Sequence, residues 1–102
     1  MNTSFVGRKR RERKKQEFLL RIRKAMSAYW KSHGISRRSM IITDLTFKKK
    51  ERGIIEITLT AENLGPIIGI AGKHIDGLTV ALREELKENV TILLFEDKTW
   101  RF

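Results

Sequence analysis

The segment Ile68-Gly69-Ile70-Ala71-Gly72-Lys73-His74-Ile75 carries the sharpest chemical signal in the chain. Two glycines three positions apart allow a tight turn and leave no Cβ to block another backbone from approaching. The amides of such a turn, and the start of a helix after it, present N–H donors and the positive end of a helix dipole. Lys73 adds a positive charge at that helix start. The pattern predicts a cradle for a sugar-phosphate strand, in which Ile67, Ile68 and Ile75 line a shallow groove for unstacked bases.

A second block of residues suits the same kind of ligand. Seven of the eight residues from 8 to 15 are cationic: Arg8, Lys9, Arg10, Arg11, Arg13, Lys14 and Lys15. Such a run cannot pack in a core, so it stays in water or meets a polyanion. Nucleic acid is the natural polyanion, because each neutralised phosphate releases counterions. The alternatives are a solvated, solubilising arm, or an anionic membrane surface, for which the run lacks interleaved bulky apolar side chains.

Composition limits the class of protein. The chain has 102 residues, a net charge of +10 and 40% hydrophobic residues, which is enough for one modest core. Residues 1–24 hold ten Lys or Arg and two Glu, so the remainder is nearly balanced. Zero cysteines exclude disulfides, Cys-ligated zinc and a cysteine nucleophile. No apolar run follows the basic residues at the start of the chain, so we expect no secretory signal. No apolar run is long enough to span a membrane, so we expect no membrane helix. We therefore expect a cytoplasmic protein.

No group of residues predicts catalysis. His33 and His74 each stand alone in the sequence and are too few for a multi-histidine metal site; we expect His33 at a helix end and His74 facing solvent or the groove. The carboxylates of residues 84, 85 and 88 fit a solvated helix face. Residues 69–73 lack the length and the hydroxyl of a nucleotide-binding loop. We therefore expect a non-catalytic protein without a metal or another cofactor.

Periodicity divides the chain into an arm, residues 1–17, which we expect to be flexible, and a domain, residues 18–102. From Phe18 an apolar stripe at helical spacing includes Tyr29 and Trp30, which we expect to be buried rather than to stack on bases. Gly34 is suited to end this helix. The remaining expected elements are strands at 40–47 and 54–60 around a charged turn at 48–53, helices at 61–68 and 73–88, and a strand at 90–95.

The glycine-turn segment resembles the IGxxGxxI signature of KH domains. The order helix–strand–strand–helix–helix–strand is similar to the type II arrangement, found in the ribosomal small-subunit protein S-three family and in Era-type GTPases. The stretch from Ile54 to Ile67 resembles the ribosomal family, and the ending at 90–102, with Trp100-Arg101, is similar to the Era-type tail. The resemblance covers residues 18–102. It implies an α+β fold, with a three-stranded mixed sheet and helices packed on one face.

The resemblance also implies that about four nucleotides of single-stranded RNA pass beside the turn. We expect an RNA-binding protein whose contacts include residues 68–75 and the arm, with ribosomal RNA or the ribosome as a partner. One departure from the family is that Ile70 and Ala71 stand where a basic residue is usual. An alternative is therefore a protein-interaction or self-associating module whose basic tail anchors it to nucleic acid. A third alternative is a DNA-binding protein.

Overall fold

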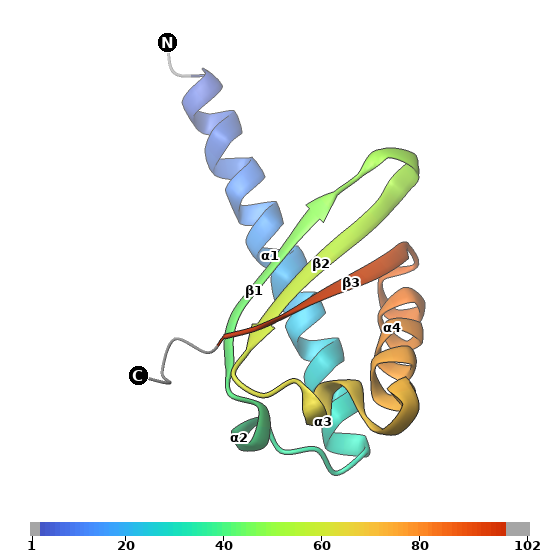
Figure 1. Cartoon of the computed structure of the whole chain (residues 1–102). Coiled ribbons are helices and arrows are strands. Elements are labelled where there is room, and N and C mark those ends of the chain that lie inside the picture. The colour runs from blue at the N-terminus through green and yellow to red at the C-terminus, as the bar shows by residue number, and fades with distance from the viewer. Residues whose placement is uncertain (1–2, 98–102) are drawn as a thin grey trace.

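A computed structural model describes the backbone of residues 3–97 and the side chains of residues 11–97. The chain is α+β, and its long elements follow the expected order (Figure 1). The helices and strands are α1 (Thr3–Ser32), α2 (Arg37–Met40), β1 (Ile42–Lys49), β2 (Ile54–Ala61), α3 (Gly65–Ile68), α4 (Lys73–Leu86) and β3 (Asn89–Glu96). Single 3-10 turns lie at Glu51–Gly53 and Ile70–Gly72. Trp100 and Arg101, which carry part of the Era-type resemblance, lie outside the described residues.

The three strands form one mixed sheet in the order β1-β2-β3, as expected. Strands β1 and β2 form an antiparallel hairpin, in which Leu45 pairs with Leu59. Strand β3 lies parallel to β2 on its other side, with Ile57 paired with Ile92. A parallel neighbour needs a crossover connection, and α3 and α4 supply it. The hairpin and the two-helix crossover therefore meet on the central strand β2.

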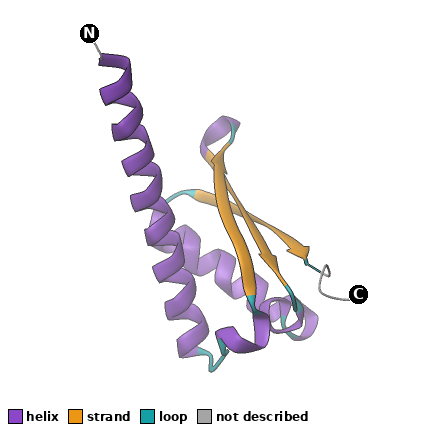
Figure 2. Ribbon diagram, turned by 90° about the vertical axis from the view of Figure 1, so that its left-hand side faces the viewer, coloured by secondary structure: helices purple, strands orange, loops and turns teal. Residues whose placement is uncertain are grey.

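The helices cover one face of this sheet (Figure 2). The alternation along β2 shows which face, because Ile55, Ile57, Leu59 and Ala61 are buried and their neighbours in sequence are only half-buried. The buried strand residues join α1 and α4 in one core. Its members are Ile22, Met26, Trp30, Met40, Leu45, Ile55, Ile57, Leu59, Ala61, Ile67, Leu78, Leu82, Leu86 and Val90. Trp30 is 2% exposed, which confirms its predicted burial.

Helix α1 is longer at its N-terminus than the apolar stripe predicts, because it begins at Thr3 instead of Phe18. Residues 8–17 are Arg, Lys, Glu and Gln, all of which have high helix propensity, so the backbone continues as a helix without an apolar face. The expected arm boundary at residue 17 falls inside this helix. The predicted end is confirmed: Gly34 has a positive φ, and Ile35 N–H donates to the Trp30 carbonyl as in a Schellman motif.

Several other boundaries differ from the sequence-based expectation. Ala61 belongs to β2, where it pairs with Ile42, so the helix expected from residue 61 is only the single turn α3. Met40 ends the short helix α2, and the first expected strand starts two residues later. Strand β1 extends to Lys49 because pairing with β2 continues to the hairpin end. This extension places the side chains of Lys48 and Lys49 on a strand instead of in a turn.

Candidate nucleic-acid interface

The glycine turn connects α3 to α4 at one end of the molecule. Gly69, Ala71 and Gly72 all have positive φ, with values of 74°, 56° and 77°. A Cβ added to Gly69 would lie 2.6 Å from Cδ2 of His74, whereas one added to Gly72 would meet nothing closer than 3.9 Å. Gly69 is therefore required for close packing, and Gly72 for its backbone conformation alone.

The two middle residues of the turn are exposed, while its two glycines are half-buried and the His74 ring packs on Gly69. Ile70 is 91% exposed, and Ala71 and Lys73 are exposed as well. The sequence-based groove is only partly present, because Ile67 is fully buried in the core and does not line a surface. Ile68 is exposed and Ile75 is half-buried, so these two remain available beside the turn.

The charge at the turn is balanced. Lys73 is the first residue of α4, and Asp76 stands in the same first turn of the helix; both are exposed. The Asp76 carboxylate lies on the Gly72 side, since a Cβ at Gly72 would be 3.9 Å from its Oδ2. An acidic residue suits the positive end of the helix dipole, but it offsets the charge of Lys73 toward an incoming phosphate. The N–H groups of Gly69, Gly72 and Lys73 already donate to the carbonyls of Gly65, Gly69 and Ile70, so the turn offers its shape more than net charge or free amides.

The two histidines do not stand alone, which corrects the sequence-based interpretation. The ring of His33, just beyond α1, stacks on Tyr29 at 4.0 Å between centroids and lies edge-on to His74 at 5.7 Å. His74 Nδ1 is 3.3 Å from the Tyr29 hydroxyl, and His74 is half-buried behind Gly69. This three-ring cluster packs the end of α1 against the start of α4, and it supports the turn from behind.

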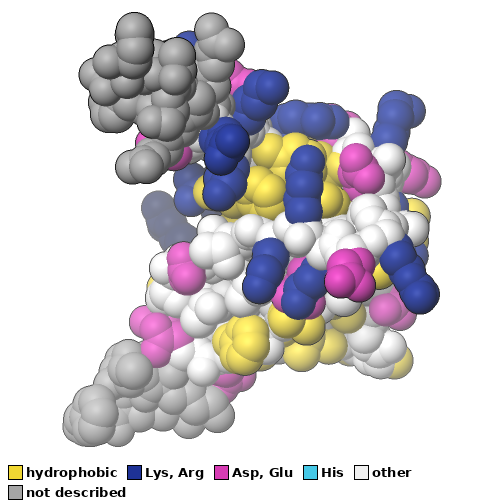
Figure 3. Space-filling model, turned by 90° about the horizontal axis from the view of Figure 1, so that it is seen from above, with side chains coloured by type: hydrophobic (Ala, Val, Ile, Leu, Met, Phe, Trp, Pro, Cys, Tyr) yellow, Lys and Arg dark blue, Asp and Glu magenta, His cyan; other side chains and the backbone are white. Residues whose placement is uncertain are grey.

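The clustered positive charge lies at the other end of α1. Arg11, Lys14, Lys15 and Phe18 recur at helical spacing on one face of this helix. Together with three residues of β1 they line a cleft of about 550 Å³ between α1 and the β1–β2 hairpin, which we call the cationic cleft. Its lining residues are Arg11, Lys14, Lys15, Phe18, Phe47, Lys48 and Lys49. Figure 3 shows an apolar surface surrounded by Lys and Arg side chains at this end of the molecule.

The structure thus divides the predicted site residues between two places. Tyr29 contacts His74 beside the turn, and Lys15 lies fourteen positions earlier on the same helix. That separation is about 21 Å along the helix axis, and Figure 1 shows the N-terminal part of α1 far from the α3–α4 connection. Of the other cations predicted to bind, Arg13 is exposed on α1, and Arg8, Lys9 and Arg10 have described backbone only.

Sequence reasoning missed the β1 half of the cationic cleft. It assigned Lys48 and Lys49 to a charged turn, Phe18 to an apolar helical stripe and Phe47 to a strand. Three lysines directly after an aromatic residue were a usable signal. Only the docking of α1 against β1 shows that Lys49 lies beside Phe18 and the helical cations.

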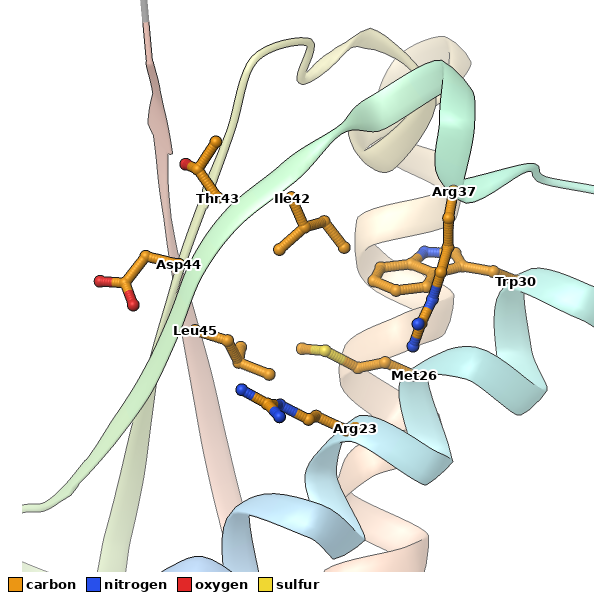
Figure 4. A pocket seen from close by; sticks show the side chains of 8 residues that line it. All are labelled: Arg23, Met26, Trp30, Arg37, Ile42, Thr43, Asp44 and Leu45. Atoms are coloured by element: carbon orange, nitrogen blue, oxygen red, sulfur yellow. The ribbon is translucent and has the colours of Figure 1, made fainter.

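A second cavity, of about 370 Å³, lies between α1 and the start of β1 (Figure 4). Met26, Trp30, Ile42 and Leu45 face one another across it, and the Arg23 and Arg37 side chains extend along its edge. Neither cavity is lined by residues of the glycine turn.

Among residues 11–97, no group of three or more histidines and carboxylates is arranged to hold a metal ion. No described helix combines the length and the apolar character needed to cross a membrane. The chain matches no protein-family model and no curated protein.

Proposed function

We propose that this chain is a non-catalytic RNA-binding protein with a type II KH-like architecture, which binds single-stranded RNA at the glycine turn. The mixed sheet supports the architecture, because β2 and β3 are parallel neighbours and the chain between them forms α3, the turn and α4. The antiparallel strand β1 and the helix α1 precede this unit, in the order that the resemblance implies. The KH assignment rests on this arrangement together with the IGxxGxxI spacing.

The proposal depends mainly on the exposure of the turn residues to solvent. Its two middle residues are exposed, and Gly72, where a Cβ would meet nothing closer than 3.9 Å, leaves room for a second backbone to approach. A phosphodiester strand placed there lies beside the N-terminus of the fourteen-residue helix α4 and the exposed Lys73. The half-buried Ile75 and the exposed Ile68 offer apolar surface to bases that pass beside it.

The cations of the arm add salt-sensitive affinity in this proposal. Because they lie about 21 Å from the turn along α1, they bind a different part of the same RNA or a structured RNA such as ribosomal RNA. Crosslinking in cells, followed by sequencing of the attached RNA, tests both the ligand class and the proposed cytoplasmic, ribosome-associated role. Recovery of DNA alone would support the DNA-binding alternative instead.

Fluorescence anisotropy with a labelled single-stranded RNA tests the turn directly. Changing Ile70 and Ala71 to Asp puts two negative charges on the exposed turn, and Asp tolerates the left-handed conformation of residue 71. We expect a loss of affinity of at least tenfold. The matched control is Val80→Glu with Ala28→Glu, which adds the same charge at exposed helical positions away from the turn. Equal affinity of the turn variant and the control contradicts the proposal.

A second candidate function is a protein-interaction module, and the exposed isoleucines favour it. Ile70 is 91% exposed and Ile68 is 37% exposed, so the tip of the turn is apolar. A protein partner docked there buries this surface, and its affinity is insensitive to salt and to nuclease. Co-purification from cells, with and without nuclease in high salt, separates the two candidates.

A further inference from the structure

We infer that the cationic cleft is a second RNA site, which holds phosphates on its cations and packs an unstacked base against the Phe18–Phe47 pair. The site is separate from the glycine turn, and it stands whether or not the turn binds RNA. Its ligand class is single-stranded RNA, because the cleft combines groups that recognise phosphates with an aromatic surface that recognises bases.

The positive charges of the cleft favour an anionic ligand. Five cationic residues line it, three from α1 and two from β1, and none of the lining residues is acidic. The side chain of Lys49 lies on the α1 side of β1, where it borders Phe18, whereas the neighbouring Lys48 points to the other face, on which its register partner is Glu56. Like charges gathered on one cleft repel one another, and salt screens this repulsion only partly at separations below about 8 Å. The neighbouring carboxylate of Glu56 lies 3.7 Å from Lys50, which does not line the cleft. A polyanion in the cleft relieves this repulsion.

The floor of the cleft is aromatic. The rings of Phe18 and Phe47 lie 4.8 Å apart between centroids at an angle of 51°. Lys49 Nζ and Arg21 Cζ stand 5.9 and 5.8 Å from the Phe18 centroid, so cations already border this ring. Both phenylalanines are half-buried, which leaves part of the pair open to a ligand. The cavity volume of about 550 Å³ falls in the range that accommodates a small ligand and suits a base with its ribose.

The same geometry favours a single strand over other anionic surfaces. A duplex hides the faces of its bases, so it has nothing to pack against the two rings. An anionic membrane needs apolar side chains that protrude for insertion, whereas these rings lie half-buried among the cations. In a single strand, a phosphate and the exposed face of a base lie close enough together to occupy one cleft.

The first test removes the β1 cations. The probe is a labelled oligouridine of about ten nucleotides, and the protein carries Ile70→Asp and Ala71→Asp so that binding at the turn is suppressed. Lys48→Gln with Lys49→Gln is compared with Lys24→Gln with Lys31→Gln, which removes the same charge from exposed positions of α1. Because only the Lys49 side chain lies on the α1 side of the strand, we expect the cleft variant to bind about fivefold more weakly and to flatten the dependence of log affinity on log salt by about 0.7. Equal losses in both variants overturn the inference.

The second test asks whether a base is bound. The second probe is an abasic phosphodiester strand of the same length, which keeps the charge and lacks the bases. In the protein that carries Ile70→Asp and Ala71→Asp, we expect a preference of about tenfold for oligouridine, and we expect Phe47→Leu, which keeps an apolar contact with Phe18, to abolish that preference. Because the readout is a ratio within one protein, a change in stability does not imitate it. No preference for oligouridine before the Phe47 change overturns the inference.

The outcomes separate this inference from the proposed function. Loss of affinity in the turn variant alone supports the turn and contradicts the cleft, and the reverse result contradicts the turn. Vesicles that contain phosphatidylserine provide the remaining comparison. If they bind and lose binding in the Lys48→Gln, Lys49→Gln variant while oligouridine binding is unchanged, the cleft is a membrane site and the inference is wrong.

Discussion

The two ends of α1 carry opposite kinds of binding surface. At the C-terminal end, the glycine turn is defined by backbone conformation, with three positive φ angles and a balanced pair of charges in Lys73 and Asp76. At the N-terminal end, the cationic cleft is defined by side chains, with Arg11, Lys14, Lys15 and Lys49 beside two phenylalanine rings. If the proposed function holds, shape and charge for one class of ligand lie in two separate places. A strand long enough to reach both ends would gain affinity from simultaneous contact.

The largest expected effect concerns charge. Changing Arg11, Lys14 and Lys15 to Gln removes three cations from the cleft. Each phosphate contact on a single strand contributes about fivefold at 0.1 M salt, so we expect RNA affinity to fall roughly 100-fold. The control changes Lys24, Lys31 and Arg38, which are exposed and lie outside the arm, and we expect it to cost less than tenfold. Anisotropy titrations at several salt concentrations measure both, and equal losses would mean that only net charge matters.

A second prediction concerns the packing behind the turn. A Cβ at Gly77 would collide with the Tyr29 hydroxyl, which is held by the histidine cluster. We expect Gly77→Ala to lower the free energy of unfolding by about 2 kcal/mol, because overpacking costs more than the gain in helix propensity. Urea denaturation measures this cost. In a Tyr29→Ala background the cost should vanish, and its persistence would show that the ring does not set the approach of α1 to α4.

A smaller effect is expected inside the turn itself. Ala71 has a φ of 56°, a conformation that costs a non-glycine residue about 1–2 kcal/mol. Glycine removes that cost but increases the entropy of the unfolded chain. We therefore expect Ala71→Gly to raise the free energy of unfolding by about 0.5 kcal/mol. Ala28→Gly, in the exposed interior of α1, should lower it by about 1 kcal/mol. The same sign for both variants would contradict the left-handed strain at residue 71.

The smallest effect is expected for the ion pair of the hairpin. Lys50 Nζ lies 3.7 Å from Glu56 Oε1, and both side chains are partly exposed. Exposed pairs of this kind contribute little, so we expect Lys50→Gln to change the free energy of unfolding by less than about 0.5 kcal/mol. Urea denaturation at low and high salt checks this value. A larger loss would give the hairpin lysines a structural role and weaken the contrast between the two ends.

Much of the fold was predictable from local patterns. The alternation in β2 and the apolar stripes of α1 and α4 each follow from the requirement that one face be buried. Gly34 predicted the end of α1 because a helix terminus favours a left-handed residue. Element ends were less predictable. Residues 8–17 have high helix propensity without an apolar stripe, and the lengths of β1 and β2 depend on the partner strand.

The chain's residues alone determined the order of the long elements, the glycine turn and the position of the charge along the sequence, because each of these is a local property. The burial of Ile67, the cluster of His33 with His74, and the position of Lys49 beside Phe18 of α1 follow from the folded arrangement alone. Each of these facts joins residues that are distant in sequence. Their contact depends on how α1 docks on the sheet and on α4, and no local periodicity specifies that docking.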